Sequence, residues 1–198
     1  MNPLTSILGT IISGFVLAII IVVALGPTGV NPIEIAVWAH VLVGITWIGL
    51  LYYFNFVQVP AVAAALADAD PGPAAINKYV APRALLYFRW AAVATWLTGL
   101  SGLAQIGGGA QGIINAFTLS GGMQVIGIGA WLGTIMLFNV WVFIWPKQKK
   151  ILGMVSAAPE EIAKAKVVAL YASRTNTLLS IPMLMSMVGY GHGGLLPI

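Results

Sequence analysis

Cysteine is absent from the 198 residues of this chain. The sequence therefore forms no disulfide, no thiolate metal site, no iron–sulfur cluster and no covalently attached c-type heme, because each of these needs cysteine sulfur. Any bound cofactor must be held by histidine, methionine, tyrosine, asparagine or carboxylate side chains.

Charged residues are also scarce. They make up 7% of the chain, against 60% hydrophobic residues and a mean hydropathy of +0.96. A soluble domain carries about 25% charged residues, so this composition predicts an integral membrane protein. Each of the uncharged stretches is long enough for at least one span of about 20 residues, and the longest can hold two. These stretches are residues 1–33, 35–67, 90–146 and 175–198.

The predicted fold is an all-α bundle with five transmembrane helices in one membrane domain, residues 1–198. The first span lacks the basic residues that begin a signal peptide, so we expect it to remain in the protein. Pro159, followed by Glu160 and Glu161, predicts that the last helix begins before the membrane. The predicted spans are residues 4–25, 35–57, 85–106, 123–145 and 167–189.

Most of the basic residues lie in two connections, and this distribution predicts the orientation. Lysine and arginine are concentrated after the second and fourth spans, in residues 58–84 and 146–166. Such connections stay in the cytoplasm, so we expect the N-terminus inside and the C-terminus outside. The formal net charge of +4 then reflects orientation and attraction to anionic membrane lipid. We expect no nucleic-acid partner.

Two histidines are predicted at the same depth, near the outer face. His40 lies just inside the outer end of the second span, and His192 lies just past the end of the last. Two imidazoles at one level can serve as the axial ligands of a heme b iron. Gly44 and Trp47 follow His40 on the same helix face, where a flat ring could approach. The alternative is that His40 is hydrogen-bonded within the bundle and His192 is solvated. Three methionines are further candidate ligands, although a methionine in a membrane helix usually packs against apolar neighbours. They are Met183, Met185 and Met187.

A second polar group is predicted near the cytoplasmic ends of the spans. Arg89 and Arg174 lie inside the third and fifth spans, where an arginine costs at least about 2.5–3.5 kcal/mol on insertion scales. The polar run 173–177 favours a basic pocket for an anion, a heme propionate or a quinone carbonyl. The alternative for Arg89 is that its side chain extends to the lipid headgroups and does not line a pocket. The predicted pocket residues are Arg83, Arg89, Asn139, Arg174 and Asn176.

Four stretches resemble one known family. They are residues 40–60, 78–90, 145–150 and 173–183, which read HVLVGITWIGLLYYFNFVQVP, KYVAPRALLYFRW, WPKQKK and SRTNTLLSIPM. They resemble the membrane domain of the bacterial cytochrome c-linked urate oxidases, the urate oxidase N-terminal family. The resemblance implies a multi-pass protein of the bacterial inner membrane, whose relatives oxidise urate and pass the electrons to a cytochrome. The second span is also similar, more distantly, to heme-b-containing protoporphyrinogen oxidases, which favours His40 as a heme ligand.

The sequence departs from the family pattern in one respect that affects function. Family members continue into further spans and a fused c-type cytochrome with a Cys-x-x-Cys-His motif, which this sequence lacks. We therefore expect a redox protein that carries electrons through heme b to a separate c-type cytochrome. The second hypothesis is a cofactor-free accessory or anchoring subunit of a larger membrane complex, packed through the glycine-rich face of span four, Gly127, Gly129 and Gly133. A third is transport of a small anion through the arginine-lined pocket.

Overall fold

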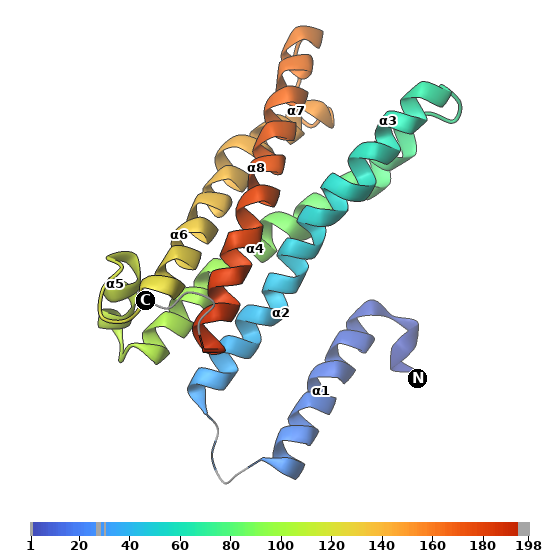
Figure 1. Ribbon diagram of the computed structural model, residues 1–198. Coiled ribbons are helices and arrows are strands. Elements are labelled where there is room, and N and C mark those ends of the chain that lie inside the picture. The colour runs from blue at the N-terminus through green and yellow to red at the C-terminus, as the bar shows by residue number, and fades with distance from the viewer. Residues whose placement is uncertain (1, 27–28, 30, 194–198) are drawn as a thin grey trace. The chain divides into compact units, whose positions relative to one another are not determined.

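The protein is built from helices, as predicted. The computed structural model describes residues 2–26, 29 and 31–193, and none of these residues lies in a β-strand. The chain divides into two compact units, Met1–Ile35 and Ala36–Ile198. Figure 1 shows the helices in chain order.

The smaller unit consists mainly of one apolar helix. A short 3₁₀ turn, η1 (Pro3–Thr5), precedes α1 (Ile7–Leu25). Ser6 caps α1, because its hydroxyl oxygen accepts a hydrogen bond from the Gly9 N–H at 3.0 Å. No residue of α1 is buried by protein. A helix that is apolar on all sides needs lipid or protein from outside its own unit around it.

The larger unit contains helices joined end to end into long rods (Figure 1). Three of the joints are π-helical turns, η2, η3 and η4. In chain order the elements are α2 (Pro32–Tyr53), η2 (Phe54–Gln58), α3 (Val59–Asp68), η3 (Ile76–Val80), α4 (Ala81–Ile106), α5 (Ala110–Phe117), α6 (Gln124–Phe138), η4 (Asn139–Ile144), α7 (Trp145–Ile151) and α8 (Pro159–Gly191).

Three helical segments of the described chain are long and apolar enough to cross a membrane. They are Ile7–Leu25, Pro32–Asp68 and Gln124–Ile151. The helices α4 and α8, with 26 and 33 residues, have sufficient length but carry more polar side chains. α8 begins at Pro159, as its sequence predicted.

Two predicted connections contain more helix than expected. The alanine-rich segment 61–67, in the predicted connection 58–84, continues from α2 through η2 as α3. The uncharged connection 107–122 contains the short helix α5.

Each π-helical turn lies just before a proline: Pro60, Pro82 or Pro146. Inside an α-helix, a proline ring clashes with the carbonyl of the residue four positions earlier. A wider turn at that carbonyl gives the ring room, so each rod continues through its proline. The residues four positions before these prolines, all within the π-helical turns, are Phe56, Lys78 and Val142.

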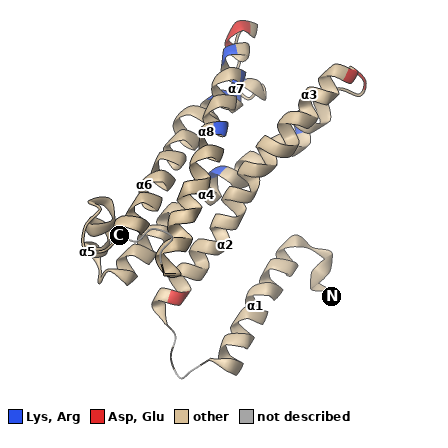
Figure 2. Ribbon diagram, in the orientation of Figure 1, with Lys and Arg blue, Asp and Glu red and all other residues tan. Residues whose placement is uncertain are grey.

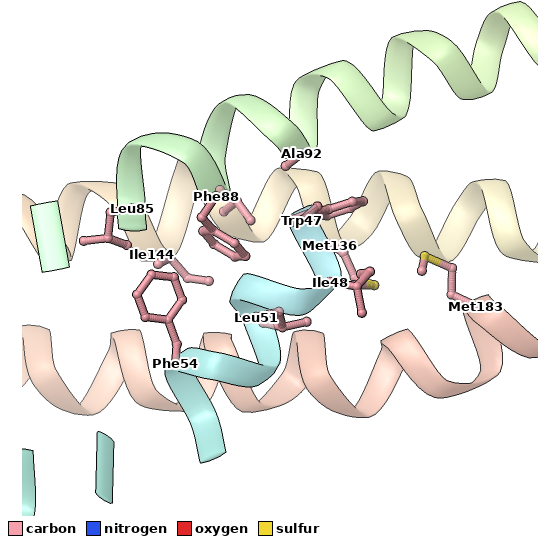
Figure 3. Packing of buried hydrophobic residues seen from close by; sticks show 11 residues of the cluster. Trp47, Ile48, Leu51, Phe54, Leu85, Phe88, Ala92, Met136, Ile144 and Met183 are labelled. Atoms are coloured by element: carbon pink, nitrogen blue, oxygen red, sulfur yellow. The ribbon is translucent and has the colours of Figure 1, made fainter. Parts of the chain in front are cut away.

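The core of the larger unit joins α2, α4, α6 and α8 (Figure 3). Phe54 packs edge-on against Phe88, with ring centroids 5.4 Å apart. α8 packs along α6, η4 and α7. The main cluster consists of Trp47, Ile48, Leu51, Phe54, Leu85, Phe88, Ala92, Met136, Val140, Ile144 and Met183.

Apart from Glu34, in the first turn of α2, charge is confined to one half of the bundle. Figure 2 shows the lysines, arginines and remaining carboxylates in the half that contains α3, α7 and the start of α8. In the opposite half, with α5 and the end of α8, Glu34 is the one charged residue among those described. This separation fits helices whose charged ends lie at the same membrane surface.

Candidate functional site

His40 is held against α4 by its Nδ1 atom. This nitrogen lies 2.9 Å from the carbonyl oxygen of Thr95 and 3.3 Å from the hydroxyl oxygen of Thr98. A carbonyl only accepts, so Nδ1 carries the proton and donates it. The ring packs on Gly99, where an added Cβ would lie 3.1 Å from Cε1. Nε2 makes no hydrogen bond within residues 2–26, 29 and 31–193. Its lone pair is therefore free to bind a metal ion.

His192 lies directly after α8 and is exposed. Its Nδ1 is 3.0 Å from the carbonyl oxygen of Val188, so this ring also donates from Nδ1. Within the larger unit, α8 runs antiparallel to α2, which places the end of α8 beside the N-terminal half of α2 (Figure 1). The two histidines are thus at the same end of the bundle, bonded to different helices.

The other residues of the predicted heme environment have packing roles. Trp47 is 2% exposed and belongs to the core, and Met183 is buried in the same cluster. Gly44 is half-buried, and a Cβ there would meet only the methyl group of Thr95, at 3.8 Å. Met185 is exposed on α8.

Asn139 and Asn176, two of the predicted pocket residues, meet in the interior. The Asn139 side-chain amide donates to the Asn176 carbonyl oxygen at 2.9 Å. The Asn176 amide in turn donates to the backbone carbonyl of Met136 at 3.0 Å. Asn176 is fully buried. The pair therefore ties α8 to the junction of α6 and η4.

Asn176 belongs to a row of polar residues on α8 that also includes Ser173 and Ser180. Their spacing of three and four residues places them on one helix face. The Asn55 amide donates to the Ser173 hydroxyl oxygen at 2.8 Å, and the Tyr52 and Ser180 hydroxyls are 2.9 Å apart. We call this set the polar seam: Tyr52, Asn55, Asn139, Ser173, Asn176 and Ser180.

Several buried polar atoms near the seam and the core have no hydrogen-bond partner among the described residues. The side-chain oxygens of Asn55 and Gln58 belong to the same π-helical turn, η2. The indole nitrogens of Trp47 and Trp141 are the others. Buried polar atoms of native proteins are usually paired, so these four are exceptions to that rule.

The predicted pocket arginines have different surroundings. The guanidinium of Arg89 stacks on the indole of Trp145, with its central carbon 3.9 Å from the ring centroid. The ammonium of Lys149 lies over the same ring at 5.8 Å. Arg83 and Arg174 are exposed. The structure thus brings together Asn139 with Asn176, and Arg89 with Trp145.

An apolar groove lies elsewhere, between α2 and α4. It has a volume of about 460 Å³, and an adjoining groove of about 370 Å³ shares Thr46 and Tyr87 with it. Neither is lined by a predicted ligand or by an arginine. No group of three or more histidine, aspartate or glutamate residues suited to a metal ion occurs among the described residues. The larger groove is lined by Val43, Thr46, Leu86, Tyr87, Trp90, Ala91 and Ala94.

Together these features define a class: an all-helical protein with apolar helices of membrane length, a polar seam in its interior and charge at one end. A family model described as "Urate oxidase N-terminal" matches residues 110–195. The resemblance to this family is therefore confirmed over α5 to the end of α8, which is less than half of the chain. No curated protein and no solved structure matches the chain.

The matched region divides the candidate residues. Asn139, Trp145, Arg174, Asn176 and His192 lie inside it. The motifs 40–60 and 78–90, which carry His40, Arg83 and Arg89, lie outside it, and their resemblance stays a prediction.

Ser180 and Thr95 make contacts that the sequence did not predict, whereas Ser173 lies in the predicted polar run 173–177. Ser173 and Ser180 have a visible signal, because polar residues spaced along one face of an apolar helix seek a partner. Thr95 contributes to His40 through its backbone carbonyl, which no side-chain pattern reveals.

Proposed function

We propose that this chain is a membrane redox protein that holds a heme b at His40 and passes electrons to a c-type cytochrome on the outer side. The observation that carries this proposal is the hydrogen bond from His40 Nδ1 to the Thr95 carbonyl. A heme-ligating histidine binds iron through one ring nitrogen while the other donates to a carbonyl or carboxylate, which fixes the ring and the tautomer. His40 has this arrangement, with Nε2 free.

The donor chemistry of the chain fits a heme. His40 would hold the iron through Nε2, and His192 is the candidate for a second ligand, since its Nδ1 also donates to a carbonyl. When bound, a heme supplies one-electron transfer between donor and acceptor. The bond to Thr95 would orient His40, and the contact with Gly99 would keep the ring close to α4.

We further propose five membrane spans in the bacterial inner membrane, with the N-terminus inside and the C-terminus outside. The charged half of the larger unit would face the cytoplasm, because lysine and arginine are retained there. α4 and α8 would span with their polar faces turned inward, as the polar seam of α8 is. The heme end would then lie near the outer face, within reach of an extracytoplasmic cytochrome.

The test is a reduced-minus-oxidised absorption spectrum of the chain purified in mild detergent. We expect the Soret and α bands of a b-type heme. His40→Gly should lose them, and added imidazole should restore them, because free imidazole can occupy the position of the missing ring. His192→Ala should shift the bands, since it removes only the second ligand. Colourless wild-type protein reconstituted with hemin, or full color in His40→Gly, would rule out the proposal.

The alternative function is a cofactor-free accessory or anchoring subunit of a larger membrane complex. The observation that favours it is the apolar groove between α2 and α4, beside the exposed side chains of Tyr87 and Trp90. The glycines of α6 do not provide the docking face, because Gly127, Gly129 and Gly133 are buried. This alternative predicts a colourless protein that co-purifies with partner subunits and loses them in Trp90→Ala.

A further inference from the structure

We propose that Arg89, Trp145 and Lys149 form a binding site for the phosphate group of an anionic phospholipid. The site joins α4 to α7 at the charged end of the larger unit. It involves neither histidine, so its test does not depend on whether the protein binds heme.

Trp145 holds two cations over one ring. The Arg89 guanidinium carbon is 3.9 Å from the indole centroid, and the Lys149 ammonium is 5.8 Å from the same point. A stacked guanidinium has one face covered by the ring, while the N–H groups at its edge remain available. The Lys149 ammonium is carried on a flexible four-carbon stem, so it can move toward an anion bound at the guanidinium edge. One phosphate group, with several acceptor oxygens, would then accept hydrogen bonds from both side chains.

Neither cation is neutralised by the protein in the part of the chain that the structure describes. The ion pair found there joins Lys150 to Glu161 at 3.0 Å, and it leaves Arg89 and Lys149 without a carboxylate. Two positive charges over one ring repel each other. A bound anion would remove this repulsion and accept charge-assisted hydrogen bonds from both side chains.

The surroundings favour a lipid phosphate over a free one. Tryptophan concentrates at the depth of the lipid headgroups, and Trp145 is the first residue of the basic helix α7. Toward the middle of the bundle, Phe138 and Val142 on the same rod and Trp90 on α4 are exposed and apolar. A lipid with its phosphate at Trp145 would lay its acyl chains on these side chains. Free phosphate would gain nothing from them.

Native mass spectrometry of the full chain in detergent tests the proposal. Phosphatidylglycerol and phosphatidylcholine are added in equal amounts, and the ratio of the two bound lipids is measured. We expect the wild type to favour phosphatidylglycerol. Arg89→Gln and Lys149→Gln should each lower the ratio about tenfold, the loss of a charge-assisted hydrogen bond. The matched control is Lys164→Gln, which removes an exposed positive charge of α8 and should leave the ratio unchanged.

Three results would overturn the proposal. Equal retention of both lipids by the wild type would exclude a phosphate-specific site. If Lys164→Gln and Lys149→Gln lower the lipid ratio equally, the preference for phosphatidylglycerol arises from general attraction of anionic lipid to positive charge and not from this site. Displacement of phosphatidylglycerol by inorganic phosphate at millimolar concentration would show that free phosphate is the ligand. If Arg89→Gln does not fold, Lys149→Gln alone decides, because Lys149 lies in the last turn of α7.

Discussion

At the scale of single residues, Asn176 and His40 are each committed to specific partners. Asn176 donates to Met136 and accepts from Asn139, which leaves no part of its amide facing lipid. His40 is fixed by a backbone carbonyl of another helix. In an apolar surrounding such bonds are costly to break, because no water replaces the lost partner. These contacts are therefore the most sensitive points of the structure.

Replacing Asn176 with leucine tests this commitment. Asn176→Leu leaves the side-chain amide of Asn139 without its acceptor, and an unsatisfied buried group costs about 1–3 kcal/mol. We expect a clear drop in the thermal midpoint of the detergent-purified protein. Thr175→Leu, at an exposed neighbouring position of α8, is the control and should unfold like the wild type. Similar midpoints for the two variants would show that the Asn pair adds no stability.

The ion pair between Lys150 and Glu161 makes a pH-dependent contribution. The hydrogen bond from Lys150, and then its charge, lower the pKa of Glu161 below its ordinary value of 4.5. A carboxyl with a lowered pKa stabilises the fold above that ordinary value and loses its contribution as the pH falls through the lowered one. Glu161→Gln should therefore lower the thermal midpoint slightly at pH 7, and the difference should vanish in acid. A difference that persists at pH 2 would contradict this account.

At the scale of the elements, the glycines of α6 and the π-helical turns determine how the rods pack. A Cβ at Gly129 would meet Ser186 and Met187 of α8. At Gly127 it would collide with the backbone carbonyl of Ala116, at the end of α5. The predicted close packing of span four is thus found within the chain. The π-helical turns add a rotation that lets each rod pass its proline.

Gly127→Ala and Gly133→Ala form a matched pair on α6. At Gly127 the colliding atom is backbone, which cannot rotate away, so overpacking should cost about 1–3 kcal/mol. At Gly133 the nearest atom is the Met183 sulfur at 3.7 Å, an ordinary contact. There alanine should be neutral or stabilising by up to about 1 kcal/mol, from its higher helix propensity. Thermal unfolding in detergent measures both, and equal stability of the two variants would contradict the packing of α5 on α6.

At the scale of the whole molecule, the absence of cysteine makes the proposed orientation directly testable. Single cysteines can be introduced at Gln111 of α5 and at Lys164 of α8, which are both exposed. No native cysteine of this sequence would be labelled alongside them. In intact cells with a permeabilised outer membrane, a membrane-impermeant maleimide should label Gln111→Cys. It should label Lys164→Cys only after the inner membrane is opened. Labelling of both positions in intact cells would refute the five-span topology.

The amino-acid sequence by itself determined the helical class, the apolar segments and the start of α8 at Pro159. These depend on composition, local charge and helix-start residues, which act over a few positions of the chain. It also grouped Asn139 with Asn176, because counting from the predicted cytoplasmic boundary gives both a similar depth.

The tertiary structure alone decided which side chains meet. It placed Arg89 on Trp145, paired Asn55 with Ser173, and gave His40 a backbone carbonyl as its partner. Such contacts depend on how each helix is rotated about its axis. Three π-helical turns change that rotation partway along the rods, so a regular 3.6-residue period no longer predicts which faces come together.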